Sequence, residues 1–293
     1  MLAAALLWST AGVTTKVLLR VIPPYMLAYI RFAIAGIIML PLLMRSRIPN
    51  IRHLALHIIP VSLLGSGNIL FFYLGIERTT VHAASMIYTA QTLIVAVLAY
   101  ILIRERISRR KLIGVLTGFA GVAVITLIPA LQKGASVSGD LTGNICIIAA
   151  TVCWSLYTIG SRQLLTKYDY SARTLTAVSI LTSAAVFGIA TAIRADHFPW
   201  VTVLRPANAV LLLHLAVMLT VVTYLLYQWA IKHSSAVTAS LVQYLQPVAS
   251  IALAIVFLGE RLSWGFVLGS LLVFAGLYLT SGLTPADLRL RRG

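Results

Sequence analysis

The sequence predicts an all-α membrane protein with ten transmembrane helices in two inverted five-helix repeats. Three observations predict this fold class: an apolar composition, continuous apolar runs long enough to cross a bilayer, and an internal repeat. Hydrophobic residues make up 60% of the 293 residues and charged residues only 10%, with a mean hydropathy of +0.95. A soluble domain usually has about 25% charged residues. We therefore expect a chain that crosses the membrane many times.

The apolar runs define ten expected spans. A membrane-spanning helix needs roughly 20 mostly apolar residues. The runs are continuous, whereas the strands of a membrane barrel would alternate polar and apolar residues over about ten positions. The expected spans cover residues 2–19, 26–44, 54–76, 80–103, 111–129, 141–162, 172–193, 208–231, 236–258 and 264–282. The first run lacks a basic leader, so no cleavable signal peptide is expected.

An internal repeat relates the two halves of the chain. Residues 68–126 align with residues 223–281 without a gap, at an offset of 155, with 15 identities over 59 positions. The aligned polar pair Gln91 and Gln246 is harder to obtain from apolar composition alone. Because each half has five expected spans, an odd number, the second half must enter the membrane in the opposite sense.

Basic residues indicate the orientation. They gather at the ends of the spans, where they set membrane topology, so the net charge of +16 is not taken as a sign of nucleic-acid binding. With a cytoplasmic N-terminus, 15 of the 23 Lys and Arg residues lie on the cytoplasmic side and 6 on the other. We expect a multi-pass protein of the inner (plasma) membrane with both termini cytoplasmic. Its expected parts are a first repeat (1–132), a second repeat (141–283) and a basic C-terminal tail (284–293) at the lipid headgroups.

Motifs near the end of each half resemble the EamA repeat of the drug/metabolite transporter superfamily. In the second half, Leu-Gly-Glu-Arg-Leu-Ser at 258–263 follows Gln246 and Pro247. In the first half, Arg-Glu-Arg-Ile-Ser at 104–108 follows a glutamine with Thr92 in place of the proline. This replacement predicts that the first copy loses a helix kink that the second copy keeps.

Other landmarks extend the resemblance over essentially the whole chain. Trp8-Ser9 and Trp154-Ser155 resemble the aromatic-small opening of each repeat, and Arg31 resembles the arginine that begins the second helix. The resemblance implies ten helices in two inverted repeats, a central cavity near the bilayer midplane, alternating access and usually export. Members transport amino acids, nucleobases, sugar phosphates or drugs, so these motifs leave the substrate open. The first span begins almost at the first residue, which leaves open a start further upstream.

Polar and aromatic residues in the middle of the spans are the candidate cavity lining. Gln243 and Gln246 lie three positions apart and face a similar side of their helix, and Tyr88 and Gln91 take the equivalent places in the first repeat. These amides would bind a polar solute or hydrogen-bond between helices, which is worth about 0.6 kcal/mol on average. The candidates for substrate binding are Trp8, Arg31, Asn68, Tyr73, Tyr88, Gln91, Trp154, Tyr157, Tyr224, Gln228, Gln243 and Gln246.

Two basic residues, Lys16 and Arg31, fall inside expected spans. A central cation in a membrane helix costs roughly 2.5 to 3.5 kcal/mol on insertion scales. Both side chains could extend to the same outer interface. Alternatively, one or both face the cavity and attract a carboxylate or phosphate, and the family resemblance favours Arg31. All seven acidic residues fall at helix ends or in loops, so no membrane-embedded carboxylate for exchanging protons against cations is expected.

Glycines line one side of the fifth and tenth expected spans. They are Gly114, Gly118 and Gly121 in the first repeat, and Gly269 and Gly276 in the second. Small residues at such spacing let helix backbones approach closely in lipid. Helix packing is the favoured interpretation, and a dimer seam or a hinge between moving bundles is the alternative.

Enzymatic function is not expected. His53 and His57 are four residues apart but lack the acidic companion of a metalloprotease helix, and the chain has no phosphate-binding loop or Gly-x-Ser-x-Gly motif. We expect no metal and no cofactor.

The hypothesis from sequence is a secondary transporter that exports amino acids or related small polar metabolites by alternating access. Its expected partners are a small-molecule substrate and the lipid bilayer, not nucleic acid, with a monomer or a homodimer left open. Efflux of drugs or toxic compounds is the alternative if the cavity is mainly aromatic. A non-transporting membrane scaffold or sensor is the alternative if the central polar residues satisfy one another.

Overall fold

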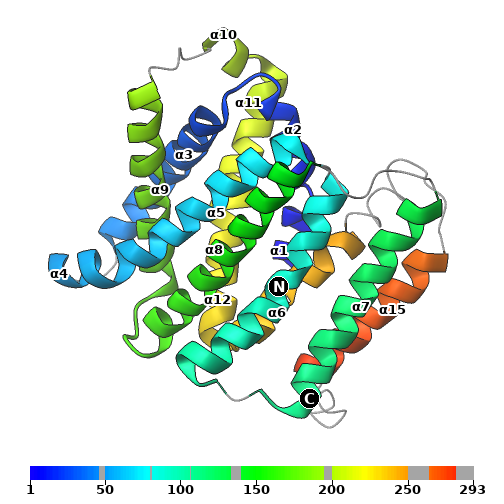
Figure 1. Cartoon of the computed structure of the whole chain (residues 1–293). Helices are drawn as coiled ribbons and strands as arrows, with labels where there is room; N and C mark the ends of the chain where they lie inside the picture. Colours follow the sequence, from blue (N-terminus) through cyan, green and yellow to red (C-terminus); the bar gives the residue numbers. More distant parts are fainter. Residues whose placement is uncertain are drawn as a thin grey trace, which may run out of the picture.

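The computed structural model describes residues 1–45, 50–79, 81–105, 107–132, 140–194, 200–249 and 264–281. Within these residues the chain is helical and has no strands (Figure 1). The elements are α1 (Leu2–Trp8), α2 (Ala11–Leu19), α3 (Pro24–Met44), α4 (Ile51–His53), η1 (Leu54–Ile58), α5 (Ile59–Arg78), α6 (Val81–Ile103), α7 (Arg109–Gln132), α8 (Leu141–Thr166), α9 (Ala172–Arg194), α10 (Trp200–Val203), α11 (Pro206–Leu213), η2 (His214–Val222), α12 (Thr223–His233), α13 (Ala236–Ser240) and α15 (Trp264–Ser281). The η elements are π-helical turns. Residues 250–263 and the tail expected at 284–293 lie outside the described residues.

In the part of the chain that the structure describes, six helical stretches are long and apolar enough to cross a membrane. They are Leu2–Leu19, Pro24–Met44, Leu54–Arg78, Leu141–Thr166, Ala172–Arg194 and Pro206–His233. Large apolar side chains such as Ile37, Ile193 and Leu271 are exposed on the outside of the bundle, where lipid rather than water is their natural contact. The expectation of an all-helical, multi-pass membrane protein is therefore confirmed.

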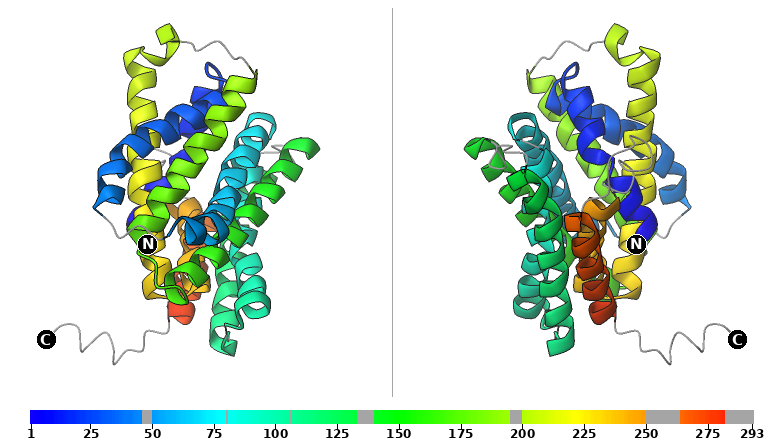
Figure 2. Two further views of the ribbon diagram at one scale, coloured as in Figure 1. Left: turned by 90° about the vertical axis from the view of Figure 1, so that its left-hand side faces the viewer. Right: turned by 90° about the vertical axis from the view of Figure 1, so that its right-hand side faces the viewer.

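Helices from the two halves of the chain pack against each other. The pairs are α3 with α9, α5 with α8, and α7 with α15. Figure 1 shows α7 and α15 side by side over most of their length, next to the remaining helices. Figure 2 shows those remaining helices splayed into two groups, with α3, α9 and α11 on one side and α5, α6 and α8 on the other.

The glycines of α7 and α15 bring these two helices into backbone contact. A Cβ atom added to Gly276 would lie 2.5 Å from the carbonyl oxygen of Gly114 and 2.6 Å from the amide nitrogen of Gly118. A Cβ added to Gly121 would lie 2.6 Å from the carbonyl oxygen of Gly269. No side chain fits at these distances, so the glycines serve helix packing within the chain.

The first expected span is not one continuous helix. It is interrupted at Ser9 and Thr10, which separate α1 from α2. The Ser9 hydroxyl donates a hydrogen bond to the carbonyl of Leu6 (2.7 Å), and the Thr10 hydroxyl donates to the carbonyl of Leu7 (2.8 Å). Hydroxyls that donate to carbonyls of the preceding turn can bend a helix. They also give these carbonyls a hydrogen-bond partner, which water cannot provide inside lipid.

The fourth and ninth expected spans differ in continuity, but the break in the described part of the ninth lies six residues before Pro247, so the predicted proline kink stays a prediction. The helix α6 runs through Thr92 without interruption, and the Thr92 hydroxyl donates a hydrogen bond to the carbonyl of Ser240 (3.0 Å). In the second half, α13 ends at Ser240 and the chain turns at Leu241 before helical residues 242–249, which contain Pro247.

We expect Gly276→Ala to destabilise the protein by about 1–3 kcal/mol, because the added methyl group overpacks the contact between α7 and α15. The matched control is Gly67→Ala, since a Cβ at Gly67 meets only the Cys153 sulfur at 3.4 Å, an ordinary contact. Thermal unfolding of the two purified variants in detergent measures the difference. Equal melting temperatures would contradict the packing role.

Candidate substrate cavity

A cavity of about 150 Å³ lies between the two halves of the bundle. At about 30 Å³ per water molecule of liquid, it has room for several waters and so for a small solute. Both halves contribute side chains to its wall. The lining residues are Trp8, Ser9, Ala11, Gly12, Val13, Thr15, Arg31, Asn68, Ile69, Phe72, Ile76, Ala84, Tyr88, Trp154, Tyr224, Gln243, Gln246 and Pro247.

Arg31 supplies positive charge to the cavity wall. It lies in α3, is only 6% exposed, and is held by neutral groups of other helices. Its Nε donates to the Thr220 hydroxyl (2.6 Å), Nη1 to the Tyr73 hydroxyl (3.2 Å) and Nη2 to the Leu219 carbonyl (3.1 Å). Tyr73 therefore anchors the guanidinium without lining the cavity. The π-helical segment η2 supplies the Leu219 carbonyl as an acceptor for the guanidinium.

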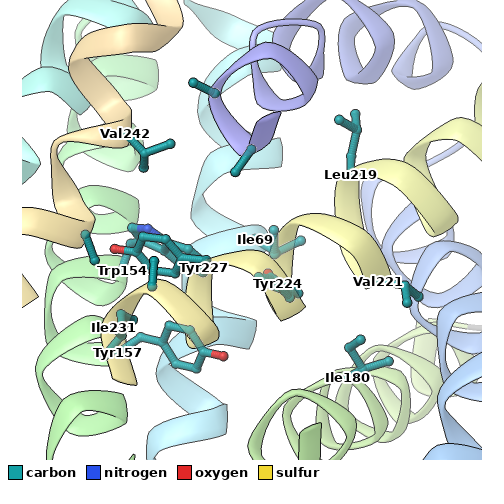
Figure 3. Packing of buried hydrophobic residues seen from close by; sticks show 14 of the residues in the cluster. Ile69, Trp154, Tyr157, Ile180, Leu219, Val221, Tyr224, Tyr227, Ile231 and Val242 are labelled. Atoms are coloured by element: carbon teal, nitrogen blue, oxygen red, sulfur yellow. The ribbon is translucent and has the colours of Figure 1, made fainter. Parts of the chain in front are cut away.

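An aromatic cluster forms one side of the cavity. The Trp8 ring meets the Trp154 ring edge-on at 5.8 Å, and Trp154 lies 5.5 Å from Tyr224, with all three residues in the cavity wall. Behind them Trp154 stacks on Tyr157 (4.9 Å) and Tyr227 (5.4 Å). Figure 3 shows Trp154, Tyr227 and Tyr157 gathered together, with Tyr224 on the neighbouring turn. The cluster gives the cavity a broad apolar face.

Amide side chains supply polar, uncharged groups to the wall. Asn68 Nδ2 donates to the Tyr88 hydroxyl (2.5 Å) and to the Ala150 carbonyl (2.9 Å), which ties α5 to α6 and α8. Gln246 Nε2 donates to Gln243 Oε1 (2.7 Å) within one helix turn. These bonds orient the amides toward the cavity without a charged partner.

A second layer of polar contacts lies outside the cavity and joins four helices. Gln228 Nε2 donates to the Tyr157 hydroxyl (2.7 Å) and to the Ser161 hydroxyl (3.1 Å). The Tyr157 hydroxyl donates in turn to Ser179 (3.3 Å), whose hydroxyl also bonds Ser62 (3.1 Å). Tyr157 and Gln228 are therefore bound to α5, α8, α9 and α12 rather than to the cavity.

Gln91 is fully buried in α6 and also lies outside the cavity lining. Among the described residues, neither its amide nitrogen nor its amide oxygen has a hydrogen-bond partner, and the indole N–H of Trp154 lacks one as well. The Tyr227 hydroxyl lies near both groups, without the geometry of a hydrogen bond. Polar groups at the centre of the bundle are thus not all satisfied by one another.

The structure brings most of the predicted site residues together. Eight of them line the cavity: Trp8, Arg31, Asn68, Tyr88, Trp154, Tyr224, Gln243 and Gln246. Four lie behind it: Tyr73, Gln91, Tyr157 and Gln228. Sequence reasoning missed the lining from α2, including Gly12 and Thr15, because it treated the first span as unbroken. The sequence Ser-Thr-Ala-Gly at 9–12 was the available signal, since such residues are typical of helix interruptions.

Lys16, the other basic residue inside a span, does not line the cavity. Its ammonium group donates to the carbonyl of Thr79 (3.0 Å), at the end of α5. This contact satisfies the charge at a helix end, where carbonyls carry partial negative charge. Arg31 therefore faces the cavity and Lys16 does not, while the interface position of Lys16 and the binding of an anion by Arg31 stay predictions.

This fold and cavity define a membrane transporter, and a family model identifies which kind. The model of the EamA-like transporter family matches residues 1–127 and again residues 141–282. The chain therefore belongs to the EamA-like transporter family, within the drug/metabolite transporter superfamily. Members of this family are transporters and not enzymes.

Named relatives have the same general character. An uncharacterized transporter of Archaeoglobus fulgidus is 28% identical, over 94% of this chain and 94% of its own. The uncharacterized inner membrane transporter YedA of Escherichia coli is 27% identical, over 96% of this chain and 90% of its own. A probable amino-acid metabolite efflux pump of Salmonella typhimurium is 25% identical, over 95% and 92%. These relatives indicate a multi-pass protein of the plasma membrane.

A solved structure shares the fold. This crystal structure has 19% sequence identity and a TM-score of 0.72, and the match covers 99% of this chain and 96% of the other. At this identity the likeness concerns the fold alone.

We expect Gln91→Leu to raise the stability of the protein by about 1 kcal/mol, because it removes a buried amide that lacks hydrogen-bond partners. The matched control is the next residue. Thr92→Val removes a hydroxyl that has a partner, the Ser240 carbonyl, and should lower stability by about 1 kcal/mol. Thermal unfolding in detergent measures both variants, and a destabilised Gln91→Leu would show that the amide is satisfied.

Proposed function

We propose that this protein is a secondary transporter that exports amino acids or related small polar metabolites by alternating access. The observation that carries the proposal is a central cavity lined by both halves of the chain, with Arg31 in its wall. Solute binding need only favour closure of the two halves around the solute, and no covalent chemistry is required. The name of the Salmonella typhimurium relative, a probable amino-acid metabolite efflux pump, supports this substrate class.

The architecture behind this mechanism is ten helices in two inverted repeats, over residues 1–132 and 141–283, with both termini and the tail at 284–293 cytoplasmic. Two observations support it. The family model matches once in each half. In addition, α7 begins at Arg109 and α15 at Trp264, which are equivalent positions of the repeat at the offset of 155, and the two helices pack together. In such transporters the solute binds where the repeats meet.

The roles that we assign follow from position. The solute contacts the eight predicted residues of the cavity wall. The guanidinium of Arg31 binds its carboxylate, the amides of Asn68, Gln243 and Gln246 bind its polar groups, and Trp8 and Trp154 form the apolar wall. Three of the four residues behind the cavity hold this wall in position through hydrogen bonds: Tyr73, Tyr157 and Gln228. The fourth, Gln91, is buried behind the wall.

Efflux of drugs or toxic compounds is the second candidate function. The observation in its favour is the aromatic part of the lining, made by Trp8, Phe72, Tyr88, Trp154 and Tyr224. A scaffold without transport activity is less well supported, because Gln91 and the Trp154 indole N–H lack partners among the described residues.

Purified protein in proteoliposomes should transport members of a panel of radiolabelled amino acids, nucleobases and organic cations. For the solute transported best, Trp154→Ala should reduce transport at least tenfold, because it removes the apolar wall. Trp229→Ala is the control, since Trp229 is 58% exposed on α12 and does not line the cavity. Transport of no solute in the panel would overturn the proposed function. An unchanged rate in a correctly inserted Trp154→Ala protein would overturn the site.

Inversion of the repeats predicts that equivalent positions lie on opposite sides of the membrane. Arg109→Cys and Trp264→Cys occupy such positions, and both native residues are exposed. In a background that lacks Cys146 and Cys153, a membrane-impermeant maleimide should label the Trp264→Cys protein from outside the cell. It should label the Arg109→Cys protein only after the membrane is opened. Labelling of both from the same side would exclude inversion.

A further inference from the structure

The cavity has positive charge without a matching negative charge. Arg31 is the charged residue in its described lining, and no carboxylate belongs to that lining. The nearest acidic residue along the lining helices, Glu77, is exposed in the last turn of α5 beside Arg78. Asp169, further along the chain, pairs with Lys232 at helix ends. Within the described part of the chain, Arg31 is therefore not paired with a carboxylate.

The guanidinium of Arg31 is held by three hydrogen bonds and keeps N–H groups that these bonds do not occupy. Its three hydrogen bonds to described residues go to two hydroxyls and one carbonyl, which are all neutral acceptors. An arginine has five N–H groups, so one N–H remains on each terminal nitrogen. Two N–H groups on adjacent nitrogens match the two oxygens of one carboxylate.

The other polar groups of the wall add hydrogen bonds without changing this charge. They are hydroxyls and amides: Ser9, Thr15, Asn68, Tyr88, Tyr224, Gln243 and Gln246. A bound carboxylate would neutralise the guanidinium. The ammonium group of an amino acid would then add a second positive charge, with no carboxylate of the described wall to receive it. Buried charge without a partner opposes binding.

The rest of the wall is apolar and aromatic. Trp8, Phe72 and Trp154, with the apolar side chains Ile69 and Ile76, surround the space beside the guanidinium. A solute that fills this space gains from burying an apolar or aromatic body. A second carboxylate on the solute would lie against these rings, and the described wall has no second cation to pair with it.

We propose that the cavity selects monoanionic solutes, in which one carboxylate is attached to an apolar or aromatic body and no ammonium group balances it. This inference rests on the proposed transport function and narrows its substrate class from amino acids and related metabolites to those related metabolites that are organic acids with net negative charge. The carboxylate pairs with Arg31, and the aromatic wall receives the body of the solute.

Four probes with the same phenyl body and different charge test the selection. They are 3-phenylpropanoate (anionic), phenylalanine (zwitterionic), 3-phenylpropanol (neutral) and phenethylamine (cationic). Isothermal titration calorimetry on the purified full-length protein measures binding, and counterflow in proteoliposomes measures transport. We expect 3-phenylpropanoate to bind at least tenfold more tightly than phenylalanine and phenethylamine to bind weakest. Equal or tighter binding of phenylalanine would overturn the selection while leaving the transport function intact.

Two variants test the assignment to Arg31. Arg31→Gln should remove the preference for the anion over the neutral alcohol, and Arg31→Lys should retain part of it because the charge remains. Lys16→Gln is the control, since it removes a nearby positive charge that bonds Thr79 outside the cavity, and it should keep the wild-type preference. A preference that survives in Arg31→Gln would overturn the assignment. If Arg31→Gln fails to fold, binding of the four probes to the native protein still tests whether the cavity selects monoanionic solutes.

Binding of none of the four probes would also overturn the proposed selection. Transport of zwitterionic amino acids in the wider panel would then show that the proposed function stands without it. Absence of transport both for every solute of that panel and for 3-phenylpropanoate would count against both.

Discussion

A membrane interior contains no water to bind polar groups, and the buried guanidinium of Arg31 shows how the fold meets this constraint. Its three partners come from α5 and from the π-helical segment η2. Within η2 the Thr220 hydroxyl bonds the Leu215 carbonyl five residues earlier, and the Leu219 carbonyl accepts from both Arg31 and Thr223. The irregular helix therefore supplies acceptors that a regular helix would use for itself.

Two helix irregularities meet beside the cavity. The break between α1 and α2 lies against the start of η2, where the Thr10 hydroxyl is 2.9 Å from Nε2 of His214. The chain after this break lines the cavity. A cavity with polar walls inside a lipid bilayer thus depends on local departures from ideal helix geometry, each satisfied by side chains rather than by water.

The remaining helix contacts are made in two different ways. Between α5 and α9, serine hydroxyls pair across the interface, Ser62 with Ser179 (3.1 Å) and Ser66 with Ser183 (2.8 Å). Between α7 and α15, glycines allow the two backbones to come into contact. Both kinds of contact have the same cause. Because lipid is as apolar as the helices, helix association in a membrane needs hydrogen bonds or close packing. The packing role of the glycines was predictable because their spacing repeats in both halves, whereas neither the helix they pack against nor the partners of the serines could be predicted, because these contacts join distant parts of the chain.

The sequence by itself determined the helical membrane class, the family and the internal repeat, because apolar run length and repeated motifs are local properties of the chain. It also pointed to eight residues of the cavity wall, since a polar residue in the middle of a span needs a partner. Only the tertiary structure decided which of these amides and phenols face the cavity and which bind one another, as Tyr157 and Gln228 do. It also decided that Lys16 bonds a helix end while Arg31 faces the cavity. The physical reason is that the partner of a buried polar group lies on another helix, and packing alone sets which helix that is.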